Sequence, residues 1–242
     1  MCTVSWLHHG SGYQLFCNRD ERLSRARASG PEITQRDGVR FLSPTDLAAG
    51  GTWIGTNEFG VSLCLLNGSP KGADCGERQY KSRGLLLPEL LTAASLVEAS
   101  ERVWNFDLLS LSPFTLAALE PGQHTAMIEW NGREKAVLPY GDPYMPLASS
   151  SLDPEGVQTK RRDEFHRRLN SAGALDSDLL LTFHMSHGAE PDAYSPCMHR
   201  PDAETVSFSW VKVTDSEIRF SYTAGAPCRA NSVITRKLSR IQ

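Results

Sequence analysis

Two stretches of alternating apolar and polar residues constrain the fold of this chain more than any other feature of its sequence. Apolar side chains occupy every second position over 206–210 and again over 218–222, and Asp215-Ser216 lies between the two stretches. A period of two is the period of a β-strand, because successive side chains point to opposite faces of a sheet. The pattern therefore predicts a β-hairpin with one buried face.

Strand-like and helix-like segments follow one another in groups along the rest of the chain. We expect further strands at 2–8, 13–17, 51–55, 61–66, 114–119 and 126–130, and helices at 82–101, 153–169 and 179–187. Grouped strands and helices favour an α+β domain of packed layers with mainly antiparallel sheets. No repeat or linker divides the sequence, and sheet-rich domains commonly reach about 200–250 residues. We therefore predict one domain over 1–242.

The composition argues against several classes of protein. Of the 242 residues, 40% are hydrophobic and 22% are charged, which is the balance of a soluble globular protein. The net charge of −3 argues against a nucleic-acid partner, because domains that bind nucleic acid are usually strongly basic. No apolar run approaches the roughly 20 residues that span a bilayer, and no signal peptide is recognised. Because the six cysteines are scattered without a C-x-x-C pair, we expect reduced thiols and a cytoplasmic location.

Cys2 is the first candidate for chemistry. Because methionine is normally removed before a small second residue, we expect loss of Met1, which leaves Cys2 with a thiol and a free α-amine. Such an amine has a pKa of about 7.7–8.0 and can act as the base for the thiol. The alternative is that Cys2 is simply a small buried side chain.

The tetrad Asn18-Arg19-Asp20-Glu21 follows a strand that we expect beside the first one. A carboxylate there can hold the ammonium form of the Cys2 amine, and a guanidinium can favour the thiolate. We therefore expect a lowered pKa for Cys2 and faster alkylation of Cys2 than of any other cysteine, including Cys75 in a polar loop. The alternative is a solvated loop with surface ion pairs.

These features together carry a resemblance that covers nearly the whole chain. Met1-Cys2, the tetrad at 18–21, Ala-Gly-Gly-Thr-Trp-Ile-Gly at 49–55 and Ser-Arg-Gly at 82–84 resemble the NRDE family, which includes the Transport and Golgi organisation protein of animals. That family is similar to the N-terminal nucleophile (Ntn) hydrolases. The resemblance implies a four-layer αββα sandwich with two mainly antiparallel sheets.

A second resemblance suggests roles for individual residues. The turn at 56–61 followed by Leu66-Asn67 is similar to the choloylglycine hydrolase and penicillin V acylase branch of that superfamily. The resemblance implies that Cys2 is the nucleophile, that Asp20 orients its amine and that Asn67 donates to the developing oxyanion. For Asn67 the alternative is a turn residue at the end of a strand.

The sequence departs from that branch at two places. The branch has an arginine where this chain has Cys17, and Arg19, on the same side of an extended strand, is the candidate substitute. The branch has a second oxyanion asparagine where the best counterpart here is the run 148–151, in which Ser150 is the candidate donor. We find no counterpart of the branch's late arginine. Asn18 and Arg83 are further candidates on the substrate side.

The remaining constellation is His184-x-x-His187 followed by Cys197-x-His199 and Arg200. Four zinc-type ligands are present, but their spacing matches no zinc pattern, and histidines also suit the C-terminal end of a helix. The resemblance favours a pocket, so we expect His187, His199 and Arg200 on the substrate side and no metal. The basic helix around Arg161 is expected to be a solvated face.

The sequence therefore predicts an amidohydrolase that forms a thioester on Cys2 with a small amide or acyl compound and needs no cofactor. The alternative is a non-catalytic carrier or trafficking protein that uses the same cleft for a small molecule, for example in haem handling. The two differ in their need for an oxyanion site, for which Asn67 and Ser150 are the candidates.

Overall fold

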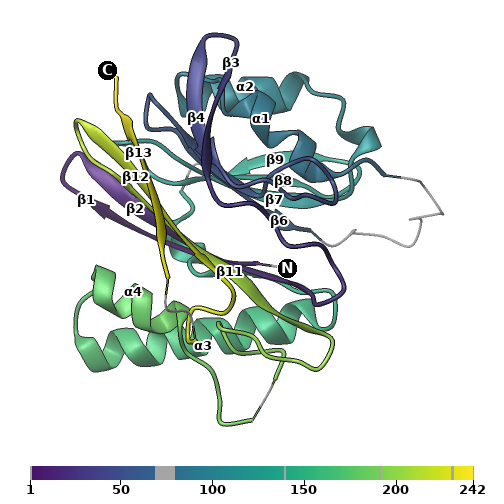
Figure 1. Ribbon diagram of the computed structural model, residues 1–242, viewed down its shortest axis with the longest axis vertical. Coiled ribbons are helices and arrows are strands. Elements are labelled where there is room, and N and C mark those ends of the chain that lie inside the picture. The colour runs from purple at the N-terminus through teal and green to yellow at the C-terminus, as the bar shows by residue number, and fades with distance from the viewer. Residues whose placement is uncertain (1, 69–79, 139, 191, 230–231, 242) are drawn as a thin grey trace.

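Two antiparallel sheets lie face to face with helices on both outer sides (Figure 1). The computed structural model describes residues 2–68, 80–138, 140–190, 192–229 and 232–241. The two sheets and their outer helices confirm the expected four-layer αββα sandwich.

The six-stranded sheet has the order β10–β1–β2–β11–β12–β13, and the seven-stranded sheet runs in sequence from β3 to β9. The strands are β1 (Cys2–His9), β2 (Gly12–Arg22), β3 (Glu32–Arg36), β4 (Val39–Ser43), β5 (Ile54–Asn57), β6 (Ser62–Asn67), β7 (Phe114–Leu119), β8 (Ala126–Trp130), β9 (Lys135–Leu138), β10 (Leu147–Ser149), β11 (Ala203–Val213), β12 (Glu217–Ala224) and β13 (Ile234–Ser239).

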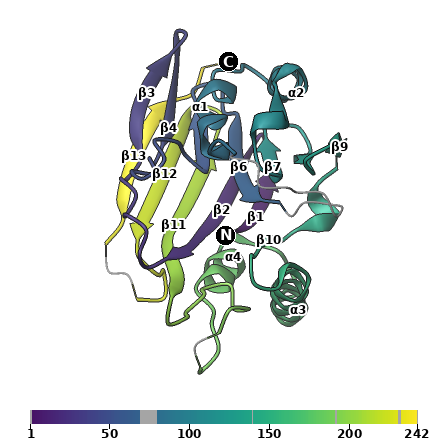
Figure 2. The same cartoon turned by 90° about the vertical axis from the view of Figure 1, so that its right-hand side faces the viewer.

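Each sheet is covered by its own helices, as Figures 1 and 2 show. The seven-stranded sheet packs against α1 (Leu87–Leu90) and α2 (Leu96–Asn105), and the six-stranded sheet against α3 (Pro154–Ala172) and α4 (Ser177–His184). The short 3-10 helices are η1 (Arg83–Leu85), η2 (Leu108–Ser110) and η3 (Asp142–Tyr144). Among the described residues, no helix combines the length and the apolar character needed to cross a bilayer.

Strand alternation produces three apolar layers. Val4 and Leu15 point between the two sheets, whereas Phe16, the next residue along β2, points outward against Phe183 of α4. On the other sheet, Leu63 packs against the α1–α2 layer. Both faces of the central strands are therefore buried.

The prediction of one continuous helix over 82–101 is wrong. The chain instead forms η1, α1 and α2, because Ser95 begins a new helix: its backbone is extended and its Oγ accepts a hydrogen bond from the Glu98 N–H at 3.2 Å. The predicted hairpin at 206–210 and 218–222 forms part of β11 and β12.

His184, at the C-terminal end of α4, is fully buried, and a 2.8 Å hydrogen bond joins its Nε2 to Ser5 Oγ. Burial, with a smaller effect of the Arg161 charge, lowers the pKa of His184 to about 3. Unfolded His184 titrates near 6.5, so the unfolded chain binds the extra proton between these two values. As the pH is lowered from 6.5, protonation of this group in the unfolded chain should therefore reduce the free energy of unfolding by about 1.4 kcal/mol per pH unit.

Urea unfolding at a series of pH values tests this prediction. His184→Gln, which keeps a polar partner for Ser5, should flatten the dependence between pH 6 and 4. Equal slopes for the two proteins would contradict it.

Candidate active site

The chain holds Cys2 between two neighbouring strands of the six-stranded sheet. Cys2 pairs with Ser149 of β10 on one side and with Arg19 of β2 on the other. Its backbone nitrogen donates a 3.0 Å hydrogen bond to Ser149 Oγ. The serine that the structure brings to this nitrogen is therefore Ser149, and Ser150 instead accepts hydrogen bonds from backbone nitrogens in the turn before α3.

Strand alternation divides the tetrad between the two faces of the sheet. Arg19 lies directly opposite Cys2 and shares its face, whereas Asn18 and Asp20 point toward the helices. The Asn18 side-chain nitrogen donates to the backbone oxygens of His184 and Pro196, both at 2.8 Å. Asn18 thus anchors the end of α4 and the following loop to β2.

Asp20 is fully buried and forms an ion pair with Arg161 of α3 at 3.0 Å. Thr205 of β11 also donates to the Asp20 carboxylate, at 2.7 Å. Arg161 is 1% exposed and donates further to Thr3 Oγ1 and to the backbone oxygen of Tyr194. The prediction of a solvated face is therefore wrong at Arg161. Arg161 is instead a partner of the tetrad, and the sequence analysis did not predict that contact.

Asp20 follows Arg19 in β2, and Arg19 pairs with Cys2, so Asp20 lies near the N-terminal end of β1. Its charge is close enough to raise the pKa of the Cys2 thiol. The expectation that the carboxylate orients a free Cys2 amine stays a prediction, because Met1 lies outside the described residues.

Cys2 opens into a cavity of about 550 Å³, and its lining includes Arg19, Asn67 and Arg83. Asn67 is the last residue of β6 and is exposed, and Arg83 opens η1. The cavity therefore brings together four of the predicted site residues. Its volume lies within the range of about 300–1,000 Å³ that is usual for small-molecule sites.

Two glycines bring Arg83 to this cavity. Gly84 accepts a 3.0 Å hydrogen bond at its oxygen from the Thr52 N–H, and Gly51 packs directly on Gly84. A Cβ on Gly51 would lie 2.4 Å from the Gly84 carbonyl carbon, so a side chain there would push η1 away. The 49–55 and 82–84 motifs thus form one contact that positions Arg83.

The Arg19 guanidinium does not take up the role expected of it beside the thiol. It forms a 2.7 Å ion pair with Asp46 and stacks 4.4 Å from the Trp53 ring centroid. Arg25 also pairs with Asp46, at 2.9 Å. Burial raises the pKa of Asp46, but the Arg25 hydrogen bond and the Arg19 charge outweigh burial and hold that pKa below its usual value.

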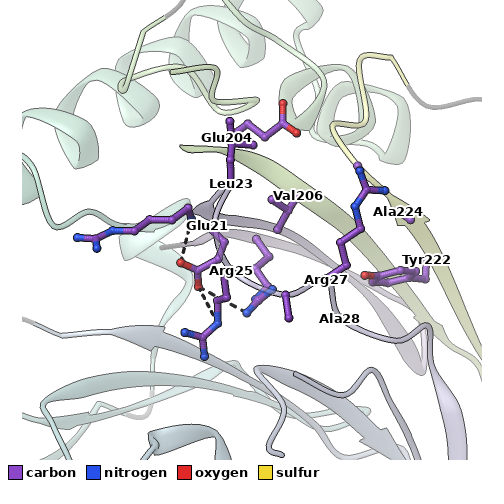
Figure 3. Close-up of a pocket in the computed structure, with 13 residues that line it drawn as sticks. Glu21, Leu23, Arg25, Arg27, Ala28, Glu204, Val206, Tyr222 and Ala224 are labelled. Carbon is purple, nitrogen blue, oxygen red and sulfur yellow. Dashed lines mark hydrogen bonds and ion pairs between the residues drawn. The ribbon is translucent and has the colours of Figure 1, made fainter. Parts of the chain in front are cut away.

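A smaller hollow of about 100 Å³ adjoins this arginine cluster, and its lining includes Arg27 and Tyr222 (Figure 3). Figure 3 also shows Glu21, whose carboxylate lies 3.6 Å from Arg25 and 3.5 Å from Arg19. Glu21 and Asp46 therefore hold both guanidinium groups in the lining of the Cys2 cavity.

The Cys2 thiol has a raised pKa, opposite to the direction expected from the sequence. Its interaction with the neighbouring Cys17 thiol is the largest cause, followed by burial. Cys17 also interacts with the Cys64 thiol of β6, and all three buried thiols belong to the core between the sheets. A thiol with a raised pKa is protonated near neutral pH. Cys75, the thiol with which Cys2 was to be compared, lies outside the described residues.

The structure places His187, His199 and Arg200 away from the Cys2 cavity. Arg200 pairs with Asp202 in a turn before β11, at 2.8 Å. His199 Nε2 lies 3.2 Å from the Cys228 sulfur, and the His187 and His199 ring centroids are 5.1 Å apart. No substrate-side role in the Cys2 cavity follows from these positions.

Comparisons with known proteins agree with this architecture. The family model for Transport and Golgi organisation 2 matches residues 1–180. Conjugated bile acid hydrolase from Clostridium perfringens is structurally similar, with a TM-score of 0.60, 10% identity and coverage of 100% of this chain and 97% of that chain. Penicillin V acylase from Agrobacterium tumefaciens has a TM-score of 0.55 and 10% identity, with coverage of 93% and 83%.

An N-acylethanolamine-hydrolyzing acid amidase orthologue from Caenorhabditis elegans has a TM-score of 0.56 and 14% identity, with coverage of 87% of this chain and 92% of that chain. No curated protein matches the sequence. At these identities the likeness establishes the shared fold.

Proposed function

This chain belongs to the Transport and Golgi organisation 2 family, and we propose that it is an N-terminal-cysteine hydrolase that cleaves a small amide or related acyl compound. The observation that carries the proposal is the cavity that Cys2 shares with Asn67 and Arg83. A thiol, an amide donor and a guanidinium thus surround one space of suitable size. The named reactions of the acylase and amidase neighbours support the same class of chemistry.

The reaction begins once Met1 is removed. Because the Cys2 thiol is protonated, its own amine must take the proton before the sulfur attacks the amide carbonyl carbon. Asn67 donates a hydrogen bond to the resulting oxyanion, and Arg83 supplies positive charge. Collapse of the tetrahedral intermediate expels the amine product, which takes the proton from the Cys2 ammonium, and leaves a thioester on the sulfur.

Hydrolysis of the thioester completes the cycle. The same amine removes a proton from water, and the hydroxide attacks the thioester carbonyl and releases the carboxylic acid and the Cys2 thiol. Ser149 Oγ, which accepts a hydrogen bond from the Cys2 nitrogen, is the group that we propose orients this amine. In this scheme Ser149 replaces the Ser150 of the sequence prediction.

Intact-mass measurement tests the proposal. The purified protein should lack Met1 and gain one acyl group when it is incubated with an N-acyl amide or β-lactam library. Cys2→Ala should abolish this adduct, whereas Cys75→Ser should keep it. The mechanism would be contradicted if most of the native protein retained Met1, or if Cys2→Ala formed as much of the acyl adduct as the unmodified protein.

The basic lining of the same cavity supports a second candidate function, a non-catalytic carrier of a small molecule. Arg22, Lys81 and Arg83 line this cavity and would favour an anionic ligand. A carrier would bind its ligand reversibly and equally well in Cys2→Ala, with no change in covalent mass. This result separates the two functions.

A further inference from the structure

Three segments from different parts of the chain bring metal-binding side chains together, away from the Cys2 cavity. His187 follows α4, His199 lies just before β11, and Cys228 lies in the turn after β12. One ligand atom from each of these residues falls within 4.8 Å of the other two. Cys197 is not one of this group of three, but it is fully buried on the same segment as His199 and its Sγ lies 3.6 Å from His199 Nε2.

The distances around His199 match the edges of a tetrahedral zinc site. His199 Nε2 lies 3.2 Å from Cys228 Sγ and 3.6 Å from Cys197 Sγ. Ligands at about 2.0–2.1 Å for nitrogen and 2.3 Å for sulfur place a nitrogen and a sulfur roughly 3.5 Å apart around one tetrahedral ion.

The far nitrogen of His187 has the partner expected of a metal-binding histidine. His187 Nδ1 lies 2.8 Å from the backbone oxygen of Gly188, so Nδ1 carries the proton and Nε2 keeps its lone pair. A hydrogen bond from the far nitrogen to a backbone carbonyl is the usual support of a metal-binding histidine. His199 Nε2 is the nitrogen that faces the two thiols, and its buried Nδ1 has no hydrogen-bond partner among the described residues.

We propose that His187, Cys197, His199 and Cys228 form a structural zinc site that joins the loop after α4 to β11 and to the turn after β12. Two thiolates and two imidazoles are a donor set that zinc prefers over the harder divalent ions. Each thiol releases its proton to solvent when it binds the ion. With four protein ligands, no position stays open for a substrate, so the site is structural rather than catalytic.

This site also supports the surroundings of Asp20. The Met198 N–H, between two of the proposed ligands, donates a 2.8 Å hydrogen bond to Thr205 Oγ1, which donates to Asp20 at 2.7 Å. Zinc would therefore hold the segment that orients Thr205. None of the four ligands lines the Cys2 cavity, so the proposal does not depend on the hydrolase function.

Metal analysis of the full-length protein tests the site. After dialysis against Zn²⁺ and removal of excess metal, we expect about one zinc ion per chain. His187→Ala, which changes an exposed loop side chain, should lower zinc affinity by at least about 10-fold, and Cys228→Ser should remove most of the bound zinc. His166→Ala, at an exposed histidine of α3, is the matched control and should keep wild-type zinc content.

Cobalt substitution provides a readout that needs no variant. Co²⁺ bound to the unmodified protein should give thiolate-to-cobalt charge-transfer absorption in the near ultraviolet and the visible bands of a tetrahedral complex. Absence of stoichiometric zinc, a Co²⁺ spectrum without thiolate bands, or wild-type zinc affinity in both His187→Ala and Cys228→Ser would each overturn the proposal.

Discussion

Replacing Arg161 with Met is expected to lower the free energy of unfolding by about 3–5 kcal/mol. The substitution keeps most of the side-chain volume but leaves the Asp20 carboxylate without its guanidinium partner in a site where both groups are buried. It also removes the hydrogen bonds to Thr3 and to the backbone oxygen of Tyr194. The expected loss exceeds the usual value for a surface ion pair because the Asp20 carboxylate that loses its guanidinium is buried rather than exposed.

Arg168→Met, seven residues later on α3, is the matched control for urea unfolding. Arg168 pairs with Glu164 at 2.6 Å, but both side chains are about a quarter exposed, so its loss should cost about 1 kcal/mol or less. Adding Asp20→Asn to Arg161→Met should recover part of the lost stability, because the double variant no longer buries a carboxylate charge that has lost its guanidinium partner. Equal unfolding free energies for the two single Arg variants would contradict the buried-pair interpretation.

The sequence predicted the sheets better than it predicted the edges of the sheets. The β11–β12 hairpin has one alternating apolar face, and that period is visible without any structure. The strand β3 was missed because it lies at a sheet edge and is exposed along its whole length, so its composition resembles that of a loop. Strand pairing there comes from the hairpin with β4 rather than from burial.

The sequence selected some of the residues that share the Cys2 cavity, but it did not predict the directions of their side chains. The resemblance selected Cys2, Asn67 and Arg83, which the structure brings to one cavity. Arg161 was missed although it stands midway between Val157 and Phe165, four residues from each, on the buried face of α3. That spacing was the available signal, and the charged neighbours on both sides of Arg161 obscured it.

The sign of the Cys2 pKa shift could not be read from the sequence. Arg19 and Cys2 do share one face of the sheet, as the strand periodicity requires. The guanidinium, however, is taken up by Asp46, which comes from a loop far along the chain, and the thiol instead meets Cys17. Both contacts are tertiary, and no local pattern encodes them.

Asn67→Ala is expected to slow acylation of Cys2 by about 10²–10³-fold, because one oxyanion donor typically contributes that much. Asn67 is exposed at the end of β6, so its truncation should change the free energy of unfolding little. A large change in rate at constant stability would therefore distinguish an oxyanion donor from a turn residue. The measurement is the rate at which the acylated mass accumulates under single-turnover conditions, compared between the variant and the unmodified protein.

Ser112→Ala is the matched control for Asn67→Ala, because Ser112 lines the same cavity but has no proposed role in catalysis. It should acylate within a few-fold of the unmodified rate. Asn67→Asp provides a sharper contrast: it preserves the size of the side chain but replaces the donor amide with a carboxylate that repels a developing negative charge. If Asn67→Asp acylates as fast as the unmodified protein, Asn67 does not donate to the oxyanion, and the backbone turn alone accounts for an asparagine at this position.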